Sequence, residues 1–441
     1  MWQFWVDRGG TFTDIVAQRP DGSIKTLKYL SENPEQYKDA AVHGIRECLG
    51  LMADDPIPPG VIECVKMGTT VATNALLERK GEDTLLLITK GFADLLRIGY
   101  QARPKLFELN IQLPSLLYRQ VSEIEERLDA NGAVLTPLAE NSARMALRNA
   151  KSLGINSVAI AFMHSYINSV HEARVAAIAA EEGFGQISVS HQVTPLMKLV
   201  SRGYTTVVDA YLSPILRRYV SQVSGELGGK EEIQLMFMQS NGGLTDAKLF
   251  QGKDAVLSGP AGGVVGMVKT AEIAGLDKLI GFDMGGTSTD VCHYAGQYER
   301  SFETEVAGVR LRAPMMNIHT VAAGGGSILF YRDGRFQVGP ESAGANPGPA
   351  CYRRGGPLTV TDCNVMLGKL HPEHFPCVFG PNADETLDAE IVVTKFKELA
   401  KEVSAHTGDP LLTPAELAAG FLRIAIENMA NAIKKISVQR G

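Results

Sequence analysis

Short apolar runs alternate along the first half of the chain with longer segments in which apolar residues recur at helical spacing. The short runs predict strands and the longer segments predict helices. We predict strands at residues 24–30, 64–67, 84–88 and 157–162, and helices at residues 138–153 and 170–182. Another helix, opened by Pro34, is predicted from its apolar positions between Ala40 and Leu49. This alternation favours an α/β fold with a mostly parallel core sheet.

The second half of the chain repeats this organisation after a long helical region at residues 195–227. It continues with a strand at 234–238, a glycine-rich loop at Ser258 and a helix to about Ala274. Because 441 residues exceed what one hydrophobic core normally serves, we expect at least two domains. We place the boundary within 185–200 and predict domains at residues 1–195 and 196–441.

Two eight-residue segments share one template. Residues 7–14 read DRGGTFTD and residues 283–290 read DMGGTSTD, and each follows a short apolar run. We interpret each segment as a strand, a tight Gly-Gly turn and a second strand. Glycines let the backbone approach a phosphate, and successive N–H groups in such turns form an anion-binding concavity. With threonine hydroxyls as further donors and aspartates suited to Mg²⁺, the pair predicts two phosphate-binding hairpins.

Other glycine-rich segments allow two interpretations. Gly68-Thr69-Thr70 is either an anion site at a helix start or an ordinary threonine cap. For residues 258–263 we favour a ligand-facing loop over a plain cap. Residues 322–327, which read AAGGGS, either contact a nucleotide or form a simple turn. Asn241-Gly242-Gly243 is first of all a turn signal, and a ligand role for Asn241 is the less favoured alternative.

Composition and charge exclude several classes of function. A net charge of −6 gives no overall attraction to nucleic acid or to an acidic membrane. No apolar stretch approaches the roughly 20 residues of a membrane helix, and Asp7 and Arg8 interrupt the apolar start, which predicts a strand and no signal peptide. Six scattered cysteines are typical of a reduced, cytoplasmic protein. The pattern contains no zinc-type histidine spacing and no nucleophile-elbow motif.

The paired hairpins resemble the phosphate-1 and phosphate-2 loops of the actin, Hsp70 and sugar-kinase ATPase fold. There, two similar α/β domains surround a nucleotide cleft. Further segments are similar to the hydantoinase A and oxoprolinase family: residues 67–81 (MGTTVATNALLERKG), 162–166 (FMHSY), 257–266 (LSGPAGGVVG), 320–327 (TVAAGGGS) and 339–345 (GPESAGA). The resemblance covers essentially the whole chain. It is strongest to the N-terminal, A-type part of the oxoprolinase branch, whose enzymes use ATP to open 5-oxo-L-proline to L-glutamate.

The resemblance implies ATP and Mg²⁺ as cofactors and, with the chemistry of the loops, a set of site residues. Asp7 and Asp283 are predicted in the Mg²⁺ water shell, and Arg8 and Asp283 are the predicted catalytic residues. Arg8 is either a transition-state cation or a substrate contact. The predicted nucleotide contacts are Gly9, Gly10, Thr11, Thr13, Gly262, Gly263, Gly285, Gly286, Thr287 and Thr289. Asp14 and Asp290 are expected to hold their hairpins rigid by accepting backbone N–H bonds.

The implied reaction couples ATP to the opening of a cyclic amide. Phosphorylating the amide oxygen turns it into a leaving group, and this step needs positioning and charge stabilisation. A B-type part, fused or as a separate subunit, is the implied partner for hydrolysis in a homo-oligomeric enzyme. The family's adenosine-loop motif is absent from the sequence. We therefore expect the module to be truncated at its C-terminus and this chain to be inactive by itself.

Three alternatives stay open at this stage. The first is the A subunit of an N-methylhydantoinase-type ATP-dependent amidohydrolase or a related carboxylase. The second is a sugar kinase, against which the family motifs outside the two hairpins argue. The third is a non-catalytic hinge module whose affinity for a partner changes with ATP.

Overall fold

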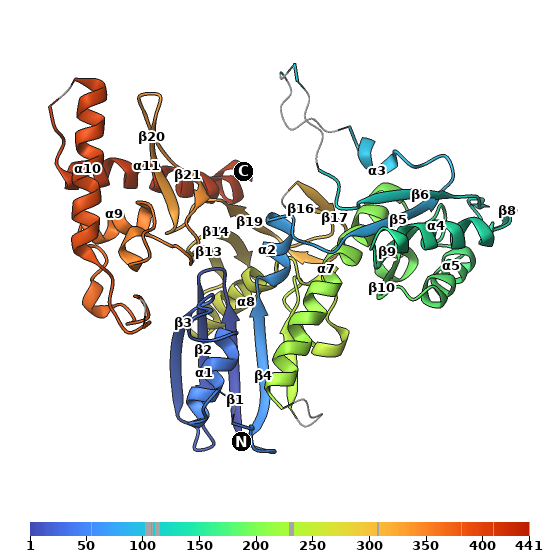
Figure 1. The fold of residues 1–441 in the computed structure, drawn as a ribbon, viewed down its shortest axis with the longest axis horizontal. Helices are drawn as coiled ribbons and strands as arrows, with labels where there is room; N and C mark the ends of the chain where they lie inside the picture. The colour runs from blue at the N-terminus through green and yellow to red at the C-terminus, as the bar shows by residue number, and fades with distance from the viewer. Residues whose placement is uncertain are drawn as a thin grey trace.

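The computed structural model describes residues 1–53, 55–101, 107, 109–110, 115–228, 233–306, 308–380, 382–408 and 410–440. A central six-stranded sheet is flanked by a four-stranded parallel sheet on one side and by a helical C-terminal lobe on the other (Figure 1). The predicted alternation of strands and helices is therefore confirmed.

The central sheet carries the first of the two predicted hairpins. Its strands, in the order β12-β11-β4-β1-β2-β3, are β1 (Trp2–Arg8), β2 (Phe12–Gln18), β3 (Ile24–Leu30), β4 (Ile62–Thr69), β11 (Gln234–Met238) and β12 (Leu244–Asp246). The β1–β4 and β4–β11 pairs are parallel, and the other pairs are antiparallel. Phe4, Val6 and Ile15 point from β1 and β2 into the main hydrophobic core, so this hairpin is built on a buried foundation.

This sheet crosses the predicted domain boundary. β11 and β12 follow residue 195 in sequence, yet β11 pairs with β4 and completes the sheet that contains β1. Strand pairing depends on tertiary contacts that local sequence patterns do not encode. The division into residues 1–195 and 196–441 therefore stays a prediction about sequence units and does not mark where one sheet ends.

Helix α1 (Ala40–Leu49) packs on the central sheet and starts later than predicted. Asp39 marks its N-terminus, because the Asp39 carboxylate accepts hydrogen bonds from Ala41 N at 2.9 Å and Val42 N at 3.1 Å. Pro34 lies outside the helix. The helix ends at Leu49 and is capped by Gly50, whose left-handed φ of 70° suits a glycine at this position.

The four-stranded sheet is buried on both faces, as a parallel sheet requires. Its order is β10 (Gln186–Val189), β9 (Ser157–Ala161), β5 (Thr84–Thr89) and β6 (Gln120–Ile124). One face, with Leu85 and Val158, packs on α4 (Glu140–Ser152) and α5 (Val170–Glu181). The opposite face, with Leu86 and Ala159, joins the main core.

Helix α7 (Leu199–Glu226) is the long helix predicted within residues 195–227. It contacts β9, β10 and β5 of the four-stranded sheet, where Ser157 Oγ donates a hydrogen bond to Ala210 O at 2.7 Å. Farther along the helix, Leu216 and Tyr219 lie in the same core as Phe4 and Val6 of β1. A single helix therefore links the two sheets.

The second hairpin belongs to a separate antiparallel sheet. It consists of β13 (Lys278–Met284), β14 (Thr289–Ala295) and β19 (Ile318–Val321). Helix α8 (Ser258–Ile273) packs on one face with Cys292, and α11 (Pro414–Ile436) packs on the other with Val291. The residues predicted as a glycine-rich loop at Ser258 are thus the first turns of α8.

The remaining elements form small hairpins and the C-terminal lobe. The hairpin β20 (Ser327–Arg332) and β21 (Arg335–Ser342) packs with α9 (Val360–Met366), α10 (Ala389–Thr407) and α11. The short strands are β7 (Arg127–Leu128), β8 (Val134–Thr136), β15 (Arg300–Ser301), β16 (Thr304–Val306), β17 (Val309–Leu311) and β18 (Met315–Met316). The short helices are α2 (Val71–Leu77), α3 (Leu95–Ile98) and α6 (Ser190–Val193).

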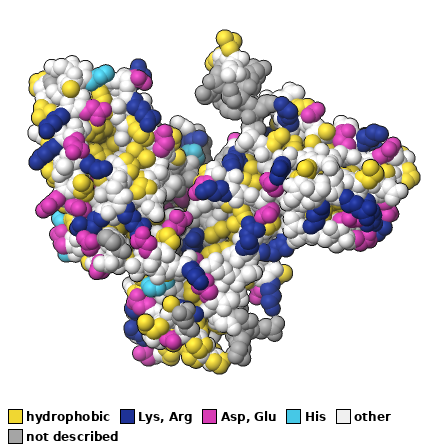
Figure 2. Space-filling view, viewed as in Figure 1, with side chains coloured by type: hydrophobic (Ala, Val, Ile, Leu, Met, Phe, Trp, Pro, Cys, Tyr) yellow, Lys and Arg dark blue, Asp and Glu magenta, His cyan; other side chains and the backbone are white. Residues whose placement is uncertain are grey.

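The surface agrees with the mixed charge of the sequence. On the face shown in Figure 2, Lys and Arg side chains are interspersed with Asp and Glu and form no continuous basic field. All six cysteines are free thiols. In the part of the chain that the structure describes, no helix combines the length and the apolar character that crossing a membrane requires.

Candidate functional site

The two motifs form hairpins with the same register. In the first, Asp7 lies opposite Asp14 and Arg8 opposite Thr13; in the second, Asp283 lies opposite Asp290. Both turns close with the same backbone hydrogen bond, from Gly9 N to Phe12 O at 3.0 Å and from Gly285 N to Ser288 O at 2.9 Å. The predicted strand, Gly-Gly turn and strand are confirmed in both copies.

The tips of the two hairpins meet. A Cβ atom at Gly286 would lie only 2.1 Å from Thr11 Oγ1, and a Cβ atom at Gly10 would lie 3.7 Å from Thr287 Oγ1. Thr11 Oγ1 is buried and has no hydrogen-bond partner among the described residues. A buried hydroxyl without a partner is costly, so Thr11 offers a donor that a bound anion can use. The structure thus brings segments 276 residues apart into one place.

The first turns of α8 lie beside the aspartates of both hairpins. A Cβ at Gly259 would be 3.9 Å from Asp7 Oδ1, and a Cβ at Gly263 would be 3.8 Å from Asp283 Oδ2. The N-terminal end of a helix carries partial positive charge and free N–H groups. Gly263, in the second turn of the helix, lies beside Asp283, and its predicted contact with a nucleotide stays a prediction. A Cβ at Gly262 would instead lie 3.8 Å from the Met238 side chain.

The aspartates of the site influence one another. Asp7 touches solvent but is surrounded by protein, and this desolvation, followed by the negative charges of Asp14 and Asp283, raises the pKa of Asp7 to about 6. Desolvation and the charge of Asp283 also raise the pKa of Asp290 to about 6, while a hydrogen bond from Thr320 opposes the shift. Such crowding of carboxylates is relieved when a cation binds between them.

The donor set fits Mg²⁺ in one specific way. No group of three or more His, Cys, Asp or Glu side chains suited to a metal occurs among the residues that the structure describes. Mg²⁺, however, is usually held by one or two carboxylates together with waters and substrate phosphates. Asp7 and Asp283, one from each hairpin, match that requirement, and they cannot form an all-protein metal cage.

Thr13 and Thr289 occupy equivalent positions and are fully buried. Thr13 Oγ1 lies 3.0 Å from Ser31 Oγ, and Thr289 Oγ1 donates to Ala323 O at 2.5 Å. Both hydroxyls are therefore engaged inside the fold, on the side away from solvent. The structure thus differs from the prediction that they face a phosphate. Neighbouring residues of a strand point to opposite faces, so Thr13 and Thr289 point away from the face that carries Asp14 and Asp290.

The outer aspartates accept hydrogen bonds from side chains. Lys28 Nζ lies 2.7 Å from Asp14 Oδ1, and Thr320 Oγ1 donates to Asp290 Oδ1 at 2.6 Å. The expected backbone N–H donors are replaced by residues of the neighbouring strands β3 and β19. Both aspartates still tie a hairpin to the next strand, as the prediction of a rigid hairpin requires.

Arg8 points to the face opposite Asp7. Its Nε lies 3.5 Å from Asp39 Oδ2, and its guanidinium carbon lies 5.3 Å from the centre of the Tyr219 ring. Alternation along β1 explains this placement, because Asp7 and Arg8 are adjacent in the strand. The structure therefore brings Asp7, Asp283 and the glycine turns together and places Arg8 against α1 and α7.

Residues 322–327, which the sequence analysis interpreted as either a nucleotide contact or a simple turn, brace the second hairpin. Gly325 N donates to Gly285 O at 2.9 Å and Gly326 N donates to Gly286 O at 2.6 Å. Thr361 N in turn donates to Gly325 O at 2.8 Å. The AAGGGS segment thus supports the turn through its backbone. Its three consecutive glycines were the available signal, because a Cβ at Gly324 or Gly326 would lie 2.8 Å from a carbonyl oxygen of the hairpin.

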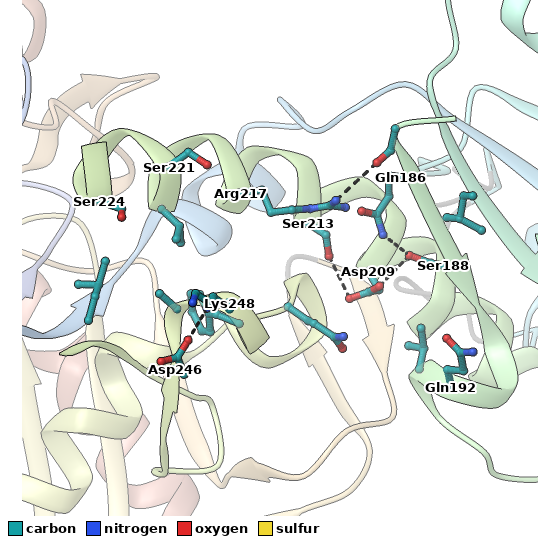
Figure 3. A pocket seen from close by; sticks show the side chains of 18 of the residues that line it. Gln186, Ser188, Gln192, Asp209, Ser213, Arg217, Ser221, Ser224, Asp246 and Lys248 are labelled. Carbon is teal, nitrogen blue, oxygen red and sulfur yellow. Dashed lines mark hydrogen bonds between the residues drawn. The ribbon is translucent and has the colours of Figure 1, made fainter. Parts of the chain in front are cut away.

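A cavity of about 1120 Å³ opens elsewhere, between β10, α7 and β12 (Figure 3). Its wall carries a polar network in which Ser188 Oγ donates to Asp209 Oδ2 at 2.7 Å and Ser213 Oγ donates to Asp209 Oδ1 at 3.1 Å. None of the residues that line it belongs to the two Gly-Gly-Thr hairpins. Asn241, the less favoured ligand candidate, accepts a hydrogen bond from Gly243 N at 2.7 Å and so forms the turn that its sequence indicates.

Comparison with known proteins adds a family context to this geometry. The model of a family described as Hydantoinase/oxoprolinase matches residues 202–441, and that of its N-terminal region matches residues 3–183. The 5-oxoprolinase of Dictyostelium discoideum is 44% identical over 100% of this chain, and that of Saccharomyces cerevisiae is 43% identical over 99%. The match covers only 38% and 37% of those two relatives, so the chain spans less than two fifths of their length.

Solved structures share the fold. The ATP-dependent caprolactamase from Pseudomonas jessenii aligns with a TM-score of 0.73 and 30% identity, covering 100% of this chain and 64% of that one. A nucleotide-free acetone carboxylase aligns with a TM-score of 0.82 and 24% identity, covering 100% of this chain and 63% of that one. At that identity the second likeness shows the fold alone.

Proposed function

Because the chain belongs to the hydantoinase/oxoprolinase family, we propose that it is the ATP-binding and phosphorylating module of a 5-oxoprolinase, which opens 5-oxo-L-proline to L-glutamate. The observation that carries this proposal is the meeting of two Gly-Gly-Thr hairpins of equal register, with one aspartate from each beside the start of α8. Such an arrangement supplies N–H donors for phosphates and two carboxylates for a cation.

The proposed chemistry follows from the inertness of a lactam. The γ-phosphoryl group of ATP passes to the amide oxygen, which releases ADP and leaves phosphate as the leaving group. Water then adds at the same carbon, and the ring C–N bond breaks as the nitrogen takes up a proton, which leaves an acyl phosphate. A second water hydrolyses the acyl phosphate to the carboxylate and inorganic phosphate. Mg²⁺, when bound, neutralises charge on the phosphates. The chain's own contribution is positioning: Asp7 and Asp283 hold the cation shell, and the turns at Gly9–Thr11 and Gly285–Thr287 hold phosphate oxygens.

We assign the threonines two different roles. Thr11, with its unpartnered hydroxyl, and Thr287, which is exposed at the second tip, are the proposed phosphate contacts. Thr13 and Thr289 are proposed as braces, since their hydroxyls are engaged inside the fold. Gly263 beside Asp283 is proposed as a point of close approach, and Gly262 adjoins it in α8. Arg8 acts as a catalytic cation only if it leaves Asp39 when substrate binds.

The choice of cyclic amide has one alternative with support. The chain is 32% identical to the alpha subunit of caprolactamase from Pseudomonas jessenii over 99% of its own length. A lactam other than 5-oxoproline is therefore the second candidate substrate. The name of that relative, an alpha subunit, supports the proposal that this chain works with a further part, as a subunit or a fused segment. We propose that this B-type part supplies the hydrolytic step, and that the whole enzyme is a homo-oligomer of the cytoplasm.

The proposal can be tested by titrating the chain with Mg²⁺-tripolyphosphate and Mg²⁺-ATP and following the ³¹P NMR signals. We expect both to bind within about threefold of each other, because the hairpins contact only the phosphates. Chelating the metal is expected to abolish both. Triphosphate binding that is unchanged in Asp283→Ala would place the phosphates elsewhere and overturn the assignment.

A further inference from the structure

A small cavity of about 270 Å³ lies at the C-terminal edge of the four-stranded parallel sheet. Phe92 lines it shortly after β5 ends, and Met163 and His164 line it directly after β9. In open α/β sheets, ligands bind outside the carboxyl ends of the strands. Figure 1 shows this edge on the α3 side of the molecule, away from the hairpin β13–β14.

The backbone around this cavity is strained. His164 and Lys198 both line it and have left-handed φ angles of 62° and 74°. Gln101, next to the lining residue Tyr100, has a φ of 58°. A residue with a side chain adopts this conformation at a cost of roughly 1–3 kcal/mol, and such residues cluster at ligand clamps. His164 Nδ1 is buried and has no hydrogen-bond partner among the described residues, so side-chain bonding does not account for its conformation.

The lining combines apolar walls with two cations. Phe92, Tyr100 and Met163 supply apolar and aromatic surface, and Lys198 and Arg202 supply positive charge. Lys198 is exposed and makes no ion pair with any residue in the described part of the chain.

Arg202 is almost fully buried, and its hydrogen bonds go to neutral oxygens. Nε donates to Ser190 Oγ at 2.9 Å, Nη1 to Leu196 O at 2.9 Å and Nη2 to Phe162 O at 2.5 Å. The nearest acid in this network is Glu172, which accepts from Ser190 Oγ at 2.6 Å and so is one residue removed. Glu172 therefore offsets part of the Arg202 charge, and the positive charge that favours an anionic group on a ligand comes mainly from Lys198.

We propose that this pocket binds a small cyclic carboxylate, with its ring against Phe92, Tyr100 and Met163 and its carboxylate toward Lys198. The volume is slightly below the roughly 300 Å³ at which drug-sized sites begin, so a single ring fits and a nucleotide does not. The pocket is separate from the phosphate hairpins and extends the proposed function. It rests on that function only for the choice of 5-oxo-L-proline as the first probe.

Binding can be measured on the full chain without nucleotide, by saturation-transfer NMR and calorimetry. The charged probes are 5-oxo-L-proline and benzoate, and their uncharged counterparts are 2-pyrrolidone and benzamide. We expect at least one charged probe to bind about tenfold more tightly than its counterpart, as one charge-assisted hydrogen bond would give. Equal affinity within both pairs, or no binding of any probe, would overturn the proposal.

Matched variants locate the site. Lys198→Met is expected to remove the preference for the charged probe, and Val200→Phe, which fills the pocket, to weaken both members of the pair. The controls are Lys248→Met and Val220→Phe, the same substitutions at the other cavity, and both are expected to bind as the original chain does. Loss of binding in the control variants with retention in Lys198→Met would contradict the assignment.

A third measurement separates this proposal from the proposed function. Asp283→Ala is expected to weaken Mg²⁺-tripolyphosphate binding by about 100-fold and to keep carboxylate binding. If the original chain binds benzoate but no triphosphate, the phosphate hairpins fail and the pocket stands. If it binds triphosphate but no carboxylate, the pocket fails and the hairpins stand.

Discussion

The two hairpins have the same turn and very different surroundings. The first lies inside a six-stranded sheet, where Phe4 is 0% and Val6 is 4% exposed. The second lies in a three-stranded sheet with β13 at its edge, where the equivalent residues Ile280 and Phe282 are 47% and 46% exposed. Helix α11 packs on Val291, yet Phe282, the cross-strand neighbour of Val291, stays uncovered.

This difference separates what a motif determines from what its environment determines. The template fixes the turn, since both copies close with the same hydrogen bond and the same register. It does not fix the packing of the strands, because burial depends on which elements cover each face. The first hairpin therefore provides the rigid side of the proposed phosphate site, and the second provides the side whose position depends on braces such as Gly325 and Gly326.

The strongest test of the comparison replaces the glycine at the equivalent position of each hairpin, Gly286 and Gly10. Gly286→Val is expected to reduce Mg²⁺-tripolyphosphate affinity beyond detection, because even its Cβ would lie 2.1 Å from Thr11 Oγ1. Gly10→Ala, at the equivalent position, is expected to change affinity by less than about threefold, since its Cβ would lie 3.7 Å from Thr287 Oγ1. Circular dichroism controls for folding. Equal effects at the two positions would show that the tips do not meet as described.

The next largest effect is expected at the metal. Asp283→Ala removes a carboxylate on the accessible side of the second hairpin and should weaken Mg²⁺-dependent phosphate binding by about 100-fold, while the fold stays intact. Asp14→Ala is the control, because Asp14 is paired with Lys28 on the neighbouring strand. We expect less than a tenth of the effect there. A larger loss of binding in Asp14→Ala than in Asp283→Ala would show that the metal is not held by Asp7 and Asp283.

A pH titration is expected to have a moderate effect. Since the pKa of Asp7 is raised to about 6, Mg²⁺-dependent binding should weaken as the pH falls through about 6, well above the ordinary value of 3.8.

The stability of the fold should change with pH in the opposite direction to the binding. The folded chain holds the Asp7 proton more tightly than the unfolded chain does, so ionised Asp7 destabilises the fold above pH 6. Asp7→Asn should therefore raise the melting temperature at pH 7.5, with the difference vanishing near pH 4. An unchanged melting temperature at pH 7.5 would contradict this account of Asp7.

The smallest effect concerns the uncovered edge strand. An exposed edge with large apolar side chains promotes association between chains. We expect Phe282→Lys to reduce concentration-dependent association in analytical ultracentrifugation, by a factor of a few at most. Phe302→Lys is the matched control, because Phe302 is 63% exposed but lies outside β13. The same reduction in both variants would show that β13 has no special role.

Local signals predicted much of the fold. The strands β3 and β11 have the predicted bounds, because apolar residues that recur between polar ones, as in β3, or follow one another, as in β11, are a local signal. The start of α1 was wrong, because the cap of Asp39 overrides the preference of Pro34 for a first helical turn. The return of β11 to the first sheet could not be predicted, since it depends on long-range pairing with β4.

The sequence identified which residues form the site better than it identified the direction in which their side chains point. The sequence template identified Asp7 and Asp283, which the structure brings near each other. It could not show that Arg8 and Thr13 face inward, because both assignments ignored the alternation of side chains along a strand. The bracing glycines were visible as a run, but only the three-dimensional structure shows which backbone they support.

Helix α7 has a mechanical consequence. Leu199 and Arg202 at its beginning line the small cavity, and Tyr219, nearer its other end, lies beneath Arg8 of the first hairpin. At about 1.5 Å per residue, some 25–30 Å separate these points along one continuous helix. Because the helix contacts both sheets, a tilt of the four-stranded sheet would move Tyr219 and with it the side chain of Arg8. Pro214 lies between the two points and lacks the N–H for one helical hydrogen bond. The helix can therefore bend at that position.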